Sequence, residues 1–132
     1  MEILVGNSDG SLSFGDFSLD SKTKATLEVN GDVYKVKTFK EITKLEKNEM
    51  FAYESVPGSV VTNFKQSEDS VSFDVEAASD VQITLEMEEG KEYSVIAGGT
   101  DLGKMTTATG GKLTLSLELT AGNKTRVEVK EN

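Results

Sequence analysis

The clearest structural signal in the chain is the stretch Ala25-Thr26-Leu27-Glu28-Val29-Asn30-Gly31-Asp32-Val33-Tyr34-Lys35-Val36. Its centre is Asn-Gly, the pair preferred in a two-residue type I′ turn between antiparallel strands. Such a turn places Leu27 opposite Tyr34 and Ala25 opposite Val36, so one face of the pair is largely apolar and the other largely polar. A three-residue turn would set Leu27 against Lys35. Because turn chemistry and apolar pattern select the same register, we predict a β-hairpin here.

The same alternation of apolar and polar residues continues through the rest of the chain. It is most regular after residue 71, in the segments 71–75, 81–87, 113–119 and 127–129. Short alternating segments that are separated by glycine-containing turns are typical of antiparallel sandwiches. We therefore predict an all-β fold, an antiparallel β-sandwich of Ig-like or similar type with two intimately packed halves.

Two segments outside these strands need a separate interpretation. Residues 41–48 fit either a short helix, with Ile42 and Leu45 three apart, or one arm of a second hairpin. We favour the hairpin because the surrounding pattern is β throughout. Residues 56–59, Val-Pro-Gly-Ser, predict a type II turn with Pro57 and Gly58 at its two central positions.

The strongest candidate boundary is the polar run Gln66-Ser67-Glu68-Asp69-Ser70. It divides the chain into an N-terminal β half, residues 1–66, which contains the Asn-Gly hairpin, and a C-terminal Ig-like β half, residues 67–132. Neither half carries many core residues of its own. We therefore expect both to pack as one compact unit.

The composition excludes several classes of chemistry. The 132 residues contain no histidine, cysteine or tryptophan, so a Ser-His-Asp triad, a thiol nucleophile and a cysteine zinc cluster are all absent. Paired carboxylates remain, but Glu68-Asp69 and Glu88-Glu89 are adjacent residues that would point to opposite faces of a strand. We expect no catalytic residue, no cofactor and no metal site.

Two short segments invite a test for ligand loops. Residues 7–11, Asn-Ser-Asp-Gly-Ser, begin like a calcium loop, but Leu12 falls where an EF-hand requires glycine. Residues 98–104 hold glycines and a lysine without the spacing of a phosphate loop. Hairpin turns explain both segments.

The charge pattern bears on partners. The chain has 14 Lys and Arg against 23 Asp and Glu, a formal charge of −9. Residues 50–92 hold 10 acids and 2 lysines, a local net charge of −8. This balance argues against nucleic acid and anionic membrane surfaces. We interpret the acidic segment first as a solvated face that keeps a β-rich protein soluble, and the alternative is an acidic docking face for a basic partner. The N-terminus lacks the features of a signal peptide and no apolar run is of membrane-spanning length. We expect a cytoplasmic protein without membrane insertion, or a secreted or surface-associated one if a leader has been removed.

Most of the nine aromatic residues follow the core pattern. Phe51 and Tyr53 are the exceptions that we select as candidate binding residues. They are two positions apart on one predicted strand, so they would share a face, and they lie close to the Pro57 turn. We expect them to form an exposed apolar patch.

Two stretches resemble known groups of proteins. Residues 30–38, 41–46 and 53–58 resemble small uncharacterised all-β proteins of anaerobic Gram-positive bacteria, some of which carry an endosialidase label. That label implies binding of a sialic acid carboxylate, for which sialidases typically use several arginines, and Arg126 is the one arginine here. The pattern from Tyr93 to Val129 resembles the Ig-like β-domains that accompany many surface and polysaccharide-active enzymes.

These observations leave more than one function open. The first hypothesis is a non-catalytic binding or interaction module, which engages a protein partner or a second copy of itself by pairing of sheet edges. The alternative is a carbohydrate-binding or glycan-hydrolase-associated domain, as the resemblance implies. A third is a subunit or assembly factor of a cell-surface or phage-like structure.

Overall fold

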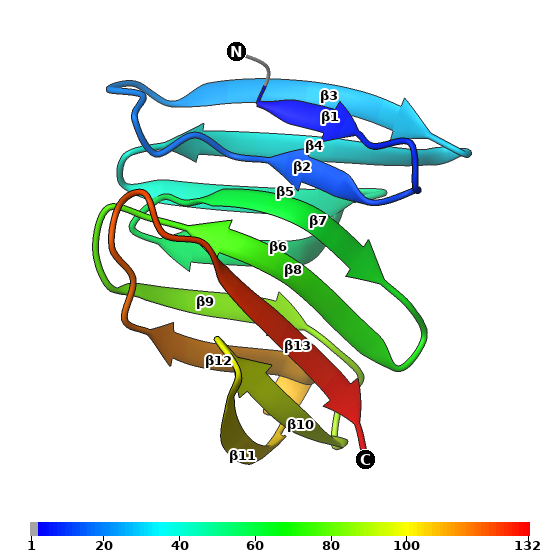
Figure 1. The fold of residues 1–132 in the computed structure, drawn as a ribbon. Helices are drawn as coiled ribbons and strands as arrows, with labels where there is room; N and C mark the ends of the chain where they lie inside the picture. Colours follow the sequence, from blue (N-terminus) through cyan, green and yellow to red (C-terminus); the bar gives the residue numbers. More distant parts are fainter. Residues whose placement is uncertain (1–2) are drawn as a thin grey trace.

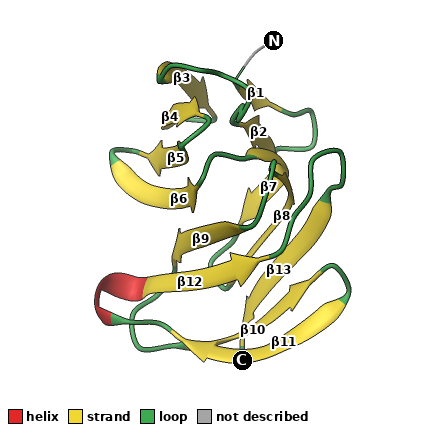
Figure 2. Ribbon diagram, turned by 90° about the vertical axis from the view of Figure 1, so that its left-hand side faces the viewer, coloured by secondary structure: helices red, strands yellow, loops and turns green. Residues whose placement is uncertain are grey.

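The computed structural model describes residues 3–132 and shows two antiparallel sheets packed face to face (Figures 1 and 2). In the described chain, the first sheet has seven strands: β1 (Leu4–Gly6), β2 (Leu12–Phe14), β7 (Val60–Gln66), β8 (Ser70–Glu76), β13 (Thr125–Glu131), β10 (Glu92–Ala97) and β11 (Thr100–Thr106), in that order. The second has six, in the order β12 (Lys112–Leu117), β9 (Val81–Glu86), β6 (Met50–Val56), β5 (Ile42–Lys47), β4 (Asp32–Phe39) and β3 (Thr23–Val29). A 3₁₀ turn, η1 (Thr109–Gly111), precedes β12. The prediction of an all-β antiparallel sandwich is confirmed.

The Asn-Gly hairpin forms as the sequence predicts. Asn30 and Gly31 both have positive φ, +52° and +87°, which is the conformation of a type I′ turn. Strands β3 and β4 pair with Leu27 opposite Tyr34 and Ala25 opposite Val36, without a register shift. The turn therefore sets the register of the whole hairpin.

The ambiguous segment 41–48 is a strand, as favoured above. Residues Ile42–Lys47 form β5, and a two-residue turn at Asn48 and Glu49, both with positive φ, leads into β6. The predicted type II turn at residues 56–59 is wrong. Gly58 does not have the positive φ that such a turn requires, and the Val56–Pro57 peptide bond is cis.

The two predicted halves contribute strands to both sheets. The polar run 66–70 is the turn between β7 and β8, where the Ser67 amide donates to the Ser70 carbonyl at 2.8 Å. In the other sheet, β6 from the N-terminal half pairs with β9 from the C-terminal half. The boundary after residue 66 thus falls at a hairpin turn inside one sheet, and both halves share one core.

The core consists of the inward residues of both sheets. The alternating apolar residues of β8, β9, β12 and β13 are all buried, as the pattern predicts: Val71, Phe73, Val75, Val81, Ile83, Leu85, Leu113, Leu115, Leu117, Val127 and Val129. An aromatic cluster of Phe14, Tyr53, Phe64 and Phe73, with ring centroids 5.2 to 6.2 Å apart, joins the two layers. Edge-to-face packing of this kind adds to the burial of apolar area. The polar residues of the same strands face outward and form the two surfaces on which a partner could bind.

Candidate functional site

The predicted apolar patch does not form, because Phe51 and Tyr53 lie on opposite sides of the sheet. Strand β6 contains a bulge: Tyr53 pairs with Leu45 and Phe51 pairs with Glu46, so Ala52 is an extra residue. An extra residue reverses the alternation from that point. Tyr53 is completely buried in the aromatic cluster, and the expectation that it is exposed is wrong.

Phe51 lies on the outer face of the six-stranded sheet and is half-buried there. Its ring is covered by Lys112, whose Nζ lies 3.5 Å from the ring centroid, and Lys44 Nζ lies 5.9 Å away. Lys112 also forms an ion pair with Glu86 at 3.7 Å. The ring therefore lies beneath cations and forms no open apolar platform.

Tyr53 belongs to a buried polar network at the loop before β7. Its hydroxyl lies 2.8 Å from Ser59 Oγ, which in turn lies 2.7 Å from Ser55 Oγ. Thr43 Oγ1 accepts from the Ser59 amide and donates to the Ser59 carbonyl, both at 3.0 Å. Burial, which outweighs the serine hydrogen bonds, raises the pKa of Tyr53 to about 12, so the phenol stays neutral at ordinary pH. This network holds the loop before β7 against strands β5 and β6 of the six-stranded sheet.

A groove opens at the corner where β2 is too short to cover β7. Strand β2 begins at Leu12, opposite Phe64, while β7 continues to Gln66. The hollow has a volume of about 430 Å³, and Tyr34 and Lys47 of the other sheet help to line it. It combines an aromatic ring with hydrogen-bonding side chains, which is the composition of a small polar-ligand site.

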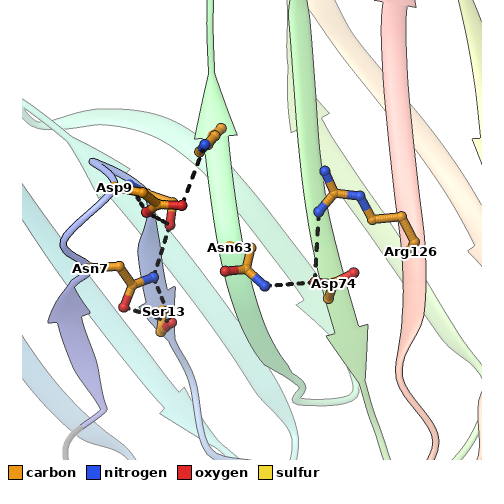
Figure 3. Close-up of polar contacts among 8 residues, drawn as sticks. Asn7, Asp9, Ser13, Asn63, Asp74 and Arg126 are labelled. Carbon is orange, nitrogen blue, oxygen red and sulfur yellow. Dashed lines mark hydrogen bonds and ion pairs between the residues drawn. The ribbon is translucent and has the colours of Figure 1, made fainter.

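Asp9 helps to line this corner groove, and its polar contacts are drawn in Figure 3. Its Oδ1 accepts from the Ser11 hydroxyl at 2.6 Å and from the Ser11 amide at 3.0 Å, and Lys65 Nζ lies 3.4 Å from its Oδ2. The two Ser11 hydrogen bonds, with a smaller contribution from Lys65, lower the pKa of Asp9 to about 2. The carboxylate is therefore ionised at neutral pH; its Oδ1 accepts from Ser11 of the same turn and its Oδ2 is paired with Lys65 of β7.

The one arginine, Arg126 of β13, lies on the outer face of the seven-stranded sheet beside Asp74 of β8, and Asn63 of β7 lies on the far side of Asp74 (Figure 3). Arg126 Nη1 lies 3.7 Å from Asp74 Oδ2, and the Asn63 amide donates to the same oxygen at 2.8 Å. Arg126 Nε also lies 3.9 Å from Glu128 Oε1. With two carboxylates beside it, the guanidinium is compensated by the protein's own charges.

The outer face of the six-stranded sheet carries a row of lysines that the candidate residues above do not include. Lys24 of β3 pairs directly with Lys37 of β4, which pairs with Lys44 of β5, which pairs with Glu54 of β6. Like charges directly opposite one another on neighbouring strands are destabilising. Lys24, Lys37 and Lys44, here called the lysine row, place three like charges side by side in a chain of net charge −9. This surface is therefore suited to carboxylates.

The lysine row could have been found from the sequence. The register of the Asn-Gly hairpin, which pairs Leu27 with Tyr34, also pairs Lys24 with Lys37. The second hairpin then adds Lys44. Along the chain these lysines are dispersed among acids, so the local net charge of the sequence does not reveal the row.

Two further observations concern residues 3–132. In this part of the chain, no group of three or more His, Cys, Asp or Glu is placed to hold a metal ion. Nor does this part contain a helix with the length and apolar character needed to cross a membrane.

Comparison of the chain with protein-family models, with curated proteins and with solved structures finds no match.

Proposed function

We propose that this β-sandwich is a non-catalytic interaction module that binds a protein strand along the outer edge of β3, beside the lysine row. One observation carries the proposal: β3 is a regular seven-residue strand at the end of its sheet, and its outward residues Lys24, Thr26 and Glu28 are exposed. Addition of a strand to such an edge is a recurrent mode of peptide recognition. Main-chain hydrogen bonds supply affinity, and the side chains on the outer face supply specificity.

The charges of the molecule support a protein partner at this surface. The acids of the chain are concentrated in residues 50–92, while Lys24, Lys35, Lys37 and Lys44 gather on three neighbouring strands. A hollow of about 400 Å³ lies among their side chains. A partner strand with carboxylates would meet complementary charge, which favours its encounter and fixes its register.

The proposal can be tested with proline at the edge. The N–H of Thr26 points away from β4, so Thr26→Pro removes a donor from the free edge without removing a bond from the hairpin. The matched control is Thr114→Pro in β12 at the opposite end of the same sheet. The Met87 amide donates to the Gly111 carbonyl just before β12, so the alternation of the β12–β9 ladder directs the N–H of Thr114 outward as well. Each immobilised variant is exposed to a lysate of the cells that make the protein, and bound proteins are quantified.

The proposal predicts partners that are retained by the wild type and by Thr114→Pro and are lost with Thr26→Pro. Sedimentation of the purified wild type and of Thr26→Pro tests whether the partner is another copy of the chain. Equal capture by all three proteins, together with self-association that ignores Thr26→Pro, would contradict binding at β3.

The corner groove favours a second candidate function, carbohydrate binding. Tyr34 offers a ring, and Lys47, Lys65 and Gln66 offer donors and acceptors around a volume that suits one sugar residue. This is also what the resemblance to accessory domains of polysaccharide-active enzymes implies. Titration with mixed mono- and oligosaccharides, followed by NMR shifts at Tyr34 and Lys47, tests it; unchanged shifts would contradict it.

A further inference from the structure

The edges of the two sheets differ in how well they are protected against pairing. Among the described residues, the edge strands are β1, β11, β12 and β3. Strand β1 has three residues, β11 is bulged against β10, and at the start of β12 the Ala108 amide donates to the Lys112 carbonyl at 3.0 Å. Short strands, bulges and covering loops are the usual protections of an edge. Strand β3 has seven residues and pairs with β4 without a bulge, whereas the protection of β12 is confined to its first residue, Lys112.

The hairpin determines which backbone groups of β3 are free. In a two-residue turn the flanking residues, Val29 and Asp32, form a hydrogen-bonded pair, and such pairs recur at every second residue. The residues between these pairs direct their backbone groups away from the hairpin partner. On β4 this is seen at Val33, which lies opposite Glu28: its carbonyl turns away from β3 and accepts from the Asn48 amide at 2.7 Å. The N–H and C=O groups of Lys24, Thr26 and Glu28 therefore point outward from the sheet.

We propose that this edge pairs with the same edge of a second copy, antiparallel and with Thr26 opposite Thr26, so that Lys24 of each copy lies opposite Glu28 of the other. This inference rests on the proposed function and names the partner strand. In that register Lys24, Thr26 and Glu28, whose backbone N–H and C=O groups are free, pair only with the same three residues of the second copy. The two-fold symmetry forms both Lys24–Glu28 pairs at once, as an isologous interface requires.

The lysine row gives an independent reason for this register. In a single copy the row Lys24, Lys37, Lys44 ends against Glu54 on one side and is open at β3 on the other. The partner's Glu28 would stand next to Lys24 and close the open end. Three lysines would then lie between two carboxylates, so pairing relieves the like-charge contact that the monomer carries.

The opposite face of β3 also gains from pairing. Its inward residues Ala25, Leu27 and Val29 are only half-buried, although the corresponding residues of the central strands are buried. In the proposed register Leu27 lies opposite Ala25 of the second copy. The edge of the core would thereby be covered, which adds apolar burial to the backbone hydrogen bonds.

Charge reversal tests the register. Lys24→Glu sets glutamate against Glu28 twice, and Glu28→Lys sets lysine against Lys24 twice, so each variant alone is expected to dimerise roughly tenfold or more weakly than the wild type. A mixture of the two variants pairs opposite charges and is expected to form a heterodimer at least as tight as the wild-type dimer. Analytical ultracentrifugation, with one variant labelled, measures dimerisation of the wild type, of each variant alone and of the mixture. Lys104→Glu on the bulged edge strand β11 is the matched control.

Each outcome decides the inference. All the substituted side chains are exposed, and thermal unfolding of each variant confirms that it is folded. Weak dimers from each variant and a restored heterodimer support the inference. Self-association that is unaffected by either charge reversal overturns the register. A wild type that is monomeric at millimolar concentration, and that still loses its partners with Thr26→Pro, overturns the second copy as partner and leaves the proposed function standing.

Discussion

The hydroxyl of Tyr53 lies 2.8 Å from Oγ of Ser59, and both side chains are completely buried. This contact ties the central strand β6 to the start of β7 in the other sheet. Ser59→Ala would remove the nearest partner of the phenol and also the partner of the Ser55 hydroxyl, which lies 2.7 Å from Ser59 Oγ. We expect a loss of about 1 to 3 kcal/mol in the free energy of unfolding, measured by urea denaturation. Ser116→Ala on the exposed face should change it by less than about 0.5 kcal/mol.

Alkaline pH should destabilise the fold through the same phenol. The pKa of Tyr53 is raised from 10.0 to about 12 in the folded state, because burial disfavours the phenolate. Its contribution is fully present below pH 10 and is lost as the pH rises from 10 to about 12. Urea denaturation across this range should show a steeper fall for the wild type than for Tyr53→Phe. Equal slopes would show that Tyr53 is not coupled to folding, and Tyr34→Phe is the control.

Acid pH should destabilise the fold through protonation of Asp9. Its pKa is lowered from 3.8 to about 2, so its contribution is present above pH 3.8 and is lost as the pH falls through about 2. Asp9→Asn should reduce the pH dependence of unfolding in this window. The same change at Asp80, an exposed acid before β9, serves as control. If Asp9→Asn keeps the wild-type pH dependence, the Ser11 hydrogen bonds do not stabilise the fold.

Gly58→Ala should be among the most damaging glycine substitutions. A Cβ at this position would lie 2.1 Å from the Phe39 carbonyl oxygen, which is backbone and cannot move aside freely. We expect a loss of about 2 kcal/mol or more in the free energy of unfolding. Gly6→Ala, whose Cβ would lie 3.3 Å from a Val29 methyl group, should cost less. Thermal unfolding of both variants compares them, and a harmless Gly58→Ala would refute the close approach.

The lysine row predicts a substitution that stabilises the monomer. Lys37 lies between Lys24 and Lys44, so Lys37→Gln removes two like-charge contacts. We expect a gain of about 0.5 kcal/mol in the free energy of unfolding at low salt, which high salt should abolish. Lys35→Gln is the control, because Lys35 lies opposite Glu46 and gains nothing from neutralisation. A salt-independent effect at Lys37 would contradict the electrostatic explanation.

The strands and the central register were predictable because their signals are local. Asn30-Gly31 determines a turn by itself, and period-two alternation determines which side chains enter the core. The order of strands in the two sheets depends on contacts between residues distant in the sequence. No local pattern encodes those contacts.

The candidate site was predictable only in part, for two reasons. Tyr53 was placed on the wrong face because the bulge at Ala52 has no distinct sequence signal, and one extra residue reverses every later position. The lysine row was implicit in the predicted register of Lys24 and Lys37. The row exists only across strands, because its lysines are far apart along the chain.

The measurement that bears most directly on binding at β3 is amide hydrogen exchange of the wild type at low and high protein concentration. The amides of Thr26 and Glu28 are free in the monomer and become hydrogen-bonded when a strand is added. We predict that both exchange more slowly at high concentration, and that Glu28 loses this protection in Thr26→Pro. Exchange of these two amides at the same rate at every concentration would contradict pairing of β3 with a second copy.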